Sequence, residues 1–67
     1  MELIVNNEPK QFAKEITLTK LLQELDLPGD KGIAIAVHDE VILKAQWDSH
    51  LLNHGDVITI IRAVQGG

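Results

Sequence analysis

The sequence predicts an α+β fold, in which a mixed sheet of about four to five strands carries one main helix packed on one face. The chain has 67 residues, which suits a single small domain spanning residues 1–67. A hydrophobic content of 45% with 24% charged residues is typical of a folded domain. Only one segment has the apolar spacing of a helix, whereas several short apolar segments have the composition of strands.

The first expected element is a β-hairpin at the N-terminus. Residues Glu2 to Val5 favour a strand, Asn6-Asn7 favours a tight turn, and Lys10 to Ala13 can return as a second strand. Because proline has no backbone N–H, we expect Pro9 to limit how early the second strand pairs.

The second element is an amphipathic helix. Its leucines have the i, i+3, i+4, i+7 spacing of one helix face: Leu18, Leu21, Leu22 and Leu25. Thr17 is expected to be the N-cap, and Pro28-Gly29 to end the segment after about two to three turns.

Two further strands are expected after the helix. Residues Ile33 to Val37 alternate large and small apolar side chains. This alternation is typical of a strand whose large side chains share one face, while backbone approaches the other face closely. His38-Asp39-Glu40 then turns the chain into a short strand, Val41 to Leu43.

The last strand, Val57 to Val64, is apolar on both of its alternating faces. It follows an irregular connection with one helical turn, Ala45 to Asn53, and a turn at residues 54–56. One helix covers one face of a sheet, so two alternatives remain for the other face. Either it keeps exposed aliphatic surface, which often marks partner docking, or the Ala45 to Asn53 connection covers it.

Composition argues against several classes of function. The net charge is −4, the lysines are scattered, and the aromatic residues are only Phe12 and Trp47, so we expect no nucleic-acid partner. An acidic body of this kind favours a partner with a basic docking surface, or serves solubility alone. The absence of cysteine excludes disulfides, thiolate catalysis and the commonest zinc sites.

No metal site, catalytic residue or membrane segment is expected. His50 and His54 have a spacing that binds metal on a helix, but Asn53 and Gly55 interrupt a helix here. The apolar N-terminus is short and lacks a preceding basic segment, so it does not read as a signal peptide. Since no apolar run approaches about 20 residues, we expect a cytoplasmic protein without membrane contact.

The chain ends in Gly66-Gly67, directly after the apolar last strand. Two glycines have no Cβ, so a terminal carbonyl carbon can enter a narrow channel and be attacked without steric shielding. This ending suits acyl chemistry, although trimmed domains and frayed ends also finish in glycine. The pair alone therefore does not decide the function.

Four segments in this order carry a resemblance: Asp39-Glu40-Val41-Ile42, Gln46-Trp47, Leu52 with Gly55-Asp56-Val57, and Ile61 to Gly67. Together with the element order, they make the chain similar to the ubiquitin-like β-grasp fold, and specifically to the ThiS family of sulfur carriers in thiamine biosynthesis. The similarity spans essentially the whole chain. The departures are His38-Asp39 for Asn-Gly, Leu43-Lys44 for Pro-Arg, and Gln65 where a third glycine is frequent.

The resemblance implies a protein co-substrate and not an enzyme. An E1-like enzyme of the ThiF type would use ATP to adenylate the terminal carboxylate, and a sulfur-donating enzyme would supply sulfur for a thiocarboxylate. A thiazole synthase of the ThiG type would then use that thiocarboxylate to build the thiazole ring. No bound cofactor is implied, since ATP is used by the activating partner.

The resemblance also assigns site residues. Gly67 carries the reactive carbonyl, and Gly66, Gln65 and Val64 belong to a flexible tail, residues 64–67, that enters the partner's channel. If extended, residues 62–67 reach about 20 Å.

Four residues are expected to dock partners: Arg62, Ile60, Ile58 and Trp47. For Trp47 the alternative is packing of its loop onto the core, and for Arg62 a solvated side chain.

Two other functions stay open at this point. One is a molybdopterin-synthase-type or other ubiquitin-like sulfur carrier, which shares the fold and the ending. The other is a β-grasp interaction domain whose diglycine is inert. Fold alone does not choose between them.

Overall fold

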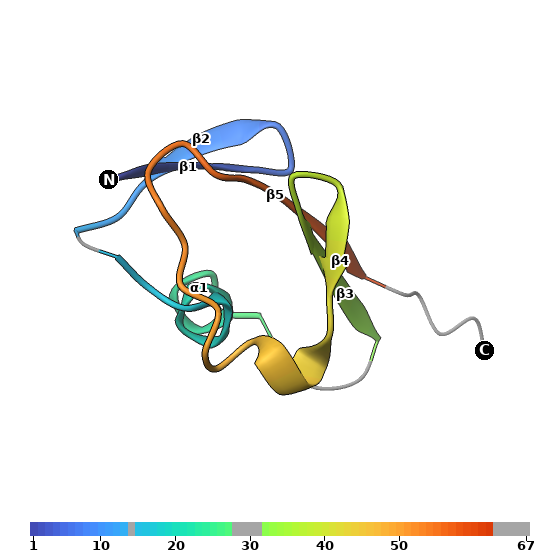
Figure 1. The fold of residues 1–67 in the computed structure, drawn as a ribbon. Coiled ribbons are helices and arrows are strands. Elements are labelled where there is room, and N and C mark those ends of the chain that lie inside the picture. Colours follow the sequence, from blue (N-terminus) through green and yellow to red (C-terminus); the bar gives the residue numbers. More distant parts are fainter. Residues whose placement is uncertain (14, 28–31, 63–67) are drawn as a thin grey trace.

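The structure is a computed structural model that describes residues 1–13, 15–27 and 32–62. Within these ranges five strands form one sheet, and a single α-helix packs on it (Figure 1). The elements are β1 (Glu2–Val5), β2 (Glu8–Gln11), α1 (Leu18–Glu24), β3 (Ile33–Val37), β4 (Glu40–Ile42), the 3-10 turn η1 (Lys44–Gln46) and β5 (Val57–Arg62). The strand order is β2-β1-β5-β3-β4, with β1 and β5 parallel and the other pairs antiparallel. The predicted mixed sheet with one helix is confirmed.

The N-terminal hairpin forms around Asn6 and Asn7, which have positive φ values of 50° and 70°. Two successive residues with positive φ are typical of the tight hairpin turn whose twist matches that of its strands. Asparagine tolerates this conformation better than most residues. The predicted hairpin and its turn are therefore confirmed.

The predicted start of β2 at Lys10 is wrong, because β2 begins at Glu8 and includes Pro9 opposite Ile4. The N–H of Ile4 donates to the carbonyl of Asp56 at 3.0 Å, on the side of β1 that faces β5. The pair of Ile4 and Pro9 therefore exchanges no ladder hydrogen bonds. Since β2 is at the edge of the sheet, the missing N–H of Pro9 falls on the outer side and costs no bond.

Helix α1 begins as predicted, with Thr17 as its N-cap. The Thr17 side-chain oxygen accepts a hydrogen bond from the backbone N–H of Lys20 at 3.2 Å. Leu18, Leu21 and Leu22 are buried, so the leucine spacing correctly identifies the face that packs on the sheet. A short amphipathic helix of this kind depends on such packing for most of its stability.

The predicted helix end at Pro28-Gly29 is wrong, because α1 ends at Glu24. Asp26 has a φ of 59°, and its N–H donates to the carbonyl of Gln23 at 3.1 Å. The N–H of Leu27 donates to the carbonyl of Leu22 at 2.9 Å. These two bonds form a Schellman motif, which reverses the chain before the Pro-Gly pair; that pair lies outside the described residues.

Strands β3 and β4 form a second hairpin around His38 and Asp39, whose φ values are 51° and 68°. The predicted β3 is confirmed, whereas β4 runs one residue earlier than predicted, from Glu40 to Ile42. The larger side chains of β3 point into the core. Ala34, on the other face of β3, is exposed, so the predicted close approach of backbone does not occur there.

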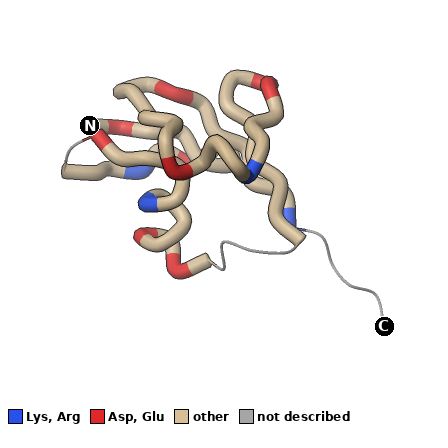
Figure 2. Tube along the Cα trace, turned by 60° about the horizontal axis from the view of Figure 1, so that its bottom comes forward, with Lys and Arg blue, Asp and Glu red and all other residues tan. Residues whose placement is uncertain are grey.

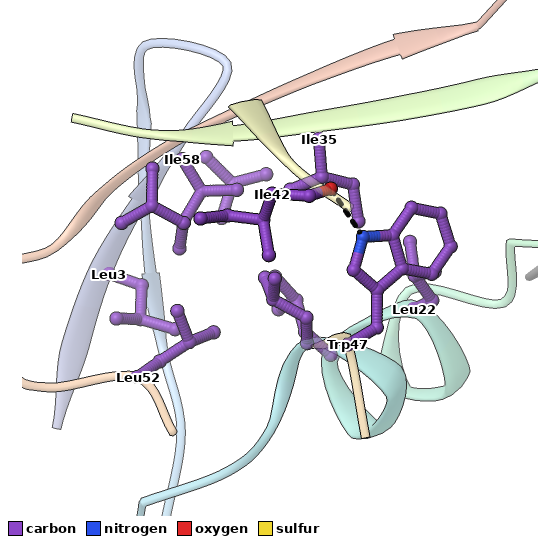
Figure 3. Packing of buried hydrophobic residues seen from close by; sticks show 11 residues of the cluster. Leu3, Leu22, Ile35, Ile42, Trp47, Leu52 and Ile58 are labelled. Atoms are coloured by element: carbon purple, nitrogen blue, oxygen red, sulfur yellow. Dashed lines mark hydrogen bonds between the residues drawn. The ribbon is translucent and has the colours of Figure 1, made fainter. Parts of the chain in front are cut away.

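The connection between β4 and β5 contains η1 and packs on the helix side of the sheet. Trp47 and Leu52 are buried in the same core as Leu22 and Ile35 (Figure 3). The N–H of Leu52 also donates to the carbonyl of Ile16 at 2.8 Å, just before α1. The alternative in which this connection covers the other face of the sheet is therefore wrong.

The two faces of β5 differ sharply in exposure. Ile58 is fully buried and Ile60 is partly buried against the core, whereas Val57 and Ile61 are 40% and 59% exposed. The helix and the η1 connection thus cover one face, and the opposite face keeps aliphatic surface. The predicted continuation of β5 to Val64 lies outside the described residues. Within the described ranges no helix is long and apolar enough to cross a membrane.

Candidate functional site

The exposed aliphatic surface lies on the face of the sheet opposite α1, and we call it the open face. The register places Ile61 beside Ala34, and Val41 beside Ala36, so these side chains share one face across β5, β3 and β4. Val41 and Ile61 are 67% and 59% exposed. Val57 and the half-buried Ile4 continue the same surface across β1. The apolar residues of the open face are Ile4, Ala34, Ala36, Val41, Val57 and Ile61.

Thr59 is the polar residue of β5 on the open face, and it is exposed beside Ala36. The antiparallel pairs β3·β5 and β3·β4 bring apolar residues from three strands together, although each strand is short. Surfaces of this kind on small domains often bind another protein. The chemistry of the open face is therefore suited to docking and not to catalysis.

The last described element of the chain is a central strand of the sheet. β5 lies between β1 and β3, and its last residue, Arg62, is paired with Ile33 and is exposed. Figure 2 shows that the acidic and basic residues are spread along the described trace. Residues 63–67 follow Arg62 in the sequence. A partner that docks on the open face is consequently close to the start of the tail.

The predicted site residues differ in what the structure says of them. Ile58 is fully buried, and Trp47 is 4% exposed with its indole N–H donating to the carbonyl of Ile42 at 2.9 Å. Neither side chain offers surface to a partner, so the predicted docking role is withdrawn for both. Packing of the Trp47 loop onto the core, the alternative, is confirmed. Ile60 is mostly within the covered face, and Arg62 remains an exposed candidate.

The tail residues Val64, Gln65, Gly66 and Gly67 lie outside the described residues. The predictions about their flexibility and reactivity remain predictions.

Three exposed residues of the open face were not among the docking residues that the sequence predicted: Val41, Val57 and Ile61. The alternation of side chains along β5 could have indicated Val57 and Ile61. Residues 57, 59 and 61 lie on one face of the strand, and residues 58 and 60 lie on the other. Both sets contain aliphatic residues, so the pattern did not say which set faces the helix. That choice required the packed structure.

A cavity of about 310 Å³ lies between α1 and η1. It is lined by Thr19, Leu22, Gln23, Leu27, Lys44, Trp47 and Asp48. Thr19 donates its hydroxyl hydrogen to Asp48 at 2.5 Å, so the two groups satisfy one another. The cavity lies on the side of the molecule away from the open face.

The histidines do not form a metal site within the described ranges. His54 accepts the backbone N–H of Glu2 on Nδ1 at 2.9 Å, and His38 contacts Asp56 at 3.0 Å. His50 and His54 are not on a helix. No group of three or more metal-binding side chains occurs in the described part of the chain.

Comparisons with known proteins agree on one family. The model of the ThiS family matches residues 3–67. The sulfur carrier protein ThiS of Escherichia coli strain K12 is 30% identical over 67 residues, which cover the whole of both chains. A thiazole synthase of Paramagnetospirillum magneticum is 30% identical over the same length, but this chain spans only 20% of that protein.

Solved structures show the same relationship at the level of the fold. The crystal structure of the thiamine biosynthesis protein ThiS from Geobacter metallireducens superposes with a TM-score of 0.85 and 25% identity, covering all of both chains. A solution structure of a thiamine biosynthesis protein from the same organism gives a TM-score of 0.83 at 25% identity, with 88% of that chain covered. The predicted β-grasp fold and the predicted family resemblance are confirmed.

Proposed function

We propose that this chain, which belongs to the ThiS family of sulfur carriers for thiamine biosynthesis, carries its sulfur as a thiocarboxylate on Gly67. The observation that carries the proposal is the match to a sulfur carrier protein along both whole chains, with a family match that includes residue 67. The fold agrees at a TM-score of 0.85. The chain then acts as a co-substrate whose chemistry is performed by partner enzymes.

The proposed chemistry begins with activation of the Gly67 carboxylate. At neutral pH an α-carboxylate is ionised and resists nucleophilic attack. One of its oxygens attacks the α-phosphorus of ATP in the active site of a ThiF-type enzyme, and pyrophosphate leaves. The carbonyl carbon of the resulting acyl adenylate then has AMP as a good leaving group. Gly66 and Gly67 leave this carbon unshielded because neither has a Cβ.

The second step exchanges oxygen for sulfur. Sulfide (HS⁻), supplied by a sulfur-donating enzyme, attacks the carbonyl carbon, and AMP leaves with the electron pair of the broken acyl–phosphate bond. Loss of the sulfur-bound proton leaves the tail as a thiocarboxylate. Sulfur is more nucleophilic than the carboxylate oxygen that it replaces, so the product can deliver sulfur to an electrophilic carbon. This chain needs no bound cofactor, and the steps would take place in the cytoplasm.

The open face is the proposed docking surface for the activating enzyme. Its aliphatic side chains suit the apolar centre of an interface, and it adjoins the strand from which the tail leaves. The net charge of −4 favours a basic rim on the partner. Docking through the body leaves residues 63–67 available to reach the active site.

A thiazole synthase of the ThiG type is the proposed consumer of the thiocarboxylate. The support is the protein named thiazole synthase that contains a segment 30% identical to this chain. A carrier and a synthase that act on one another benefit from being joined, because tethering raises their effective concentration.

The test is the intact mass of the protein after incubation with ATP, a ThiF-type enzyme and a sulfur donor. We expect a mass gain equal to one sulfur-for-oxygen exchange, and no gain in a variant that lacks Gly67. The enzyme is first shown to be active on another carrier. If the mass is then unchanged, the proposal fails and the chain is an interaction domain. Use of the product by a molybdopterin synthase and not by a thiazole synthase would move it to the other carrier class.

A further inference from the structure

We propose that the edge of β5 from Ile60 to Arg62 is a β-augmentation site for an extended segment of the adenylating enzyme. The segment would add as a short strand beside β5 and thereby guide the tail into the active site. This inference rests on the proposed function, since it names how the enzyme that reacts with Gly67 holds the chain before that residue.

The first observation is that β1 is too short to cover β5. The β1·β5 register ends with Val5 opposite Ile58, whereas β5 continues to Arg62. On its other side, β5 is paired with β3 as far as Arg62 opposite Ile33. The last part of β5 therefore has a neighbouring strand on one side only, among the described residues (Figure 1).

The second observation is how the β1 ladder ends. The N–H of Asn6 donates to the carbonyl of Ile58 at 2.9 Å, and the side-chain Oδ1 of Asn6 accepts from the N–H of Ile60 at 2.8 Å. In a parallel ladder the backbone carbonyl of one residue would accept that second bond. With a φ of 50°, Asn6 turns the backbone away towards β2, and its side-chain carbonyl takes the place of the missing acceptor.

The third observation concerns the direction of the backbone groups beyond this point. The backbone carbonyl of Ile58 and the backbone N–H of Ile60 both point towards β1, where Asn6 bonds to them. The carbonyl of Val57 points to the opposite side, where it accepts from the N–H of His38. Because these directions alternate along a strand, the carbonyl of Ile60 and both backbone groups of Arg62 face the side without a strand. No described residue bonds to them.

These groups are arranged to receive a strand. One residue of a parallel segment can donate to the Ile60 carbonyl and accept from the Arg62 N–H, which repeats the pattern made by Asn6 two residues earlier. Strand addition of this kind gains affinity from main-chain hydrogen bonds and specificity from alternate side chains. The exposed Arg62 selects a carboxylate on the segment, and the exposed Ile61 an apolar residue.

The other edges of the sheet fit this role less well. β2 contains Pro9 and carries exposed charge at Glu8, two features that protect edges from pairing. β4 has three residues and lies two strands away from β5. Among the described strands, β5 alone is followed in the sequence by the tail, so a segment bound at its edge lies next to Arg62, from which residues 63–67 continue.

The first test is amide hydrogen exchange of the ¹⁵N-labelled protein, alone and saturated with an unlabelled ThiF-type enzyme. We expect the exchange of the Arg62 amide to slow by about tenfold or more in the complex. The Ile61 amide faces β3, so it is the internal control and should already be protected in the free protein. An Arg62 amide that exchanges equally fast in both states overturns the inference. Protection that appears with protein concentration and without enzyme assigns the edge to a second copy and also overturns it.

The second test compares Arg62→Pro with Arg62→Ala. Proline removes the edge N–H and leaves the β3 ladder intact, because that N–H faces away from β3, whereas alanine removes only the side chain. Circular dichroism and the urea midpoint establish that both variants are folded. We expect Arg62→Pro to lower kcat/KM for adenylation about tenfold below Arg62→Ala. Equal rates overturn the inference alone, whereas a wild-type chain that is never adenylated overturns the proposed function with it.

Discussion

The indole N–H of Trp47 donates a hydrogen bond to the backbone carbonyl of Ile42 at 2.9 Å, inside the core (Figure 3). Ile42 is the last residue of β4, and Trp47 directly follows η1. The bond joins the end of β4 to the residue after η1, and it gives the indole nitrogen, the one polar atom of the ring, a hydrogen-bond partner. It therefore holds the connection on the helix side and leaves the open face uncovered.

Trp47→Phe should lower the free energy of unfolding by about 1–3 kcal/mol, because the buried Ile42 carbonyl loses its donor. Trp47→Ala should cost about 3–5 kcal/mol, since it also leaves a cavity. Urea unfolding followed by far-UV circular dichroism measures both, as these variants lack the single tryptophan. A Trp47→Phe protein as stable as the wild type would mean that the bond contributes nothing.

Asp26→Gly should raise the free energy of unfolding by up to about 1 kcal/mol. Asp26 has a φ of 59° in the Schellman motif that ends α1, and glycine adopts this conformation without steric cost. Asp26→Ala is the matched control and should be destabilising, because alanine pays the full cost of the left-handed conformation. The urea midpoints of the two variants and the wild type measure these changes. If Asp26→Ala were more stable than Asp26→Gly, the left-handed position assigned to Asp26 would be contradicted.

Ile61→Ala and Ile58→Ala should separate docking from folding. Ile61 is exposed, so its truncation should change stability by less than about 0.5 kcal/mol, while raising KM for the activating enzyme about tenfold. Ile58 is fully buried, so its truncation should cost about 2–5 kcal/mol.

The measurements are urea unfolding and the rate of ATP-dependent adenylation at several carrier concentrations. The open face has no docking role if the folded Ile61→Ala protein keeps the wild-type KM.

Asp56→Ala should destabilise the protein by about 1 kcal/mol. This loss should exceed that of His38→Asn, in which asparagine tolerates the φ of 51° at this position. The Asp56 carboxylate accepts the backbone N–H of Asn53 at 2.8 Å and contacts the His38 ring at 3.0 Å. The His38 side chain is 57% exposed, so its ion-pair contribution is small. Thermal unfolding of the two variants gives the order, and a larger loss from His38→Asn would show that the imidazole contact dominates.

Asn6→Gly and Asn6→Asp should differ although both tolerate a positive φ. Glycine removes the acceptor of the Ile60 N–H and should cost about 1 kcal/mol, whereas aspartate keeps an oxygen there. We also expect the Ile60 amide to exchange faster with solvent in Asn6→Gly only. Unchanged exchange at Ile60 in that variant would contradict the role given to the side chain.

Much of the fold could be predicted from local pattern. The asparagine pair at 6 and 7, the leucine spacing of α1 and the alternation of β3 each correspond to one element in the structure. Each of these features depends on residues close together in the sequence, so the sequence alone predicts it. The errors lie at element ends. The Schellman motif forms through local bonds, but its left-handed residue is Asp26 and not the glycine that usually marks such a helix end. The placement of Pro9 depends on the bond of Ile4 to Asp56, a residue distant in the sequence that local pattern does not identify.

The candidate site, like the fold, could be predicted from the sequence only in part. The sequence by itself determined the diglycine ending, the absence of cysteine and the order of elements that carries the family resemblance. Only the tertiary structure decided which face of β5 is covered, because Val57, Ile58, Ile60 and Ile61 are similar in hydrophobicity. The difference between them arises when α1 and Trp47 pack on one side and remove Ile58 from water. A partner can bind only what that packing leaves exposed.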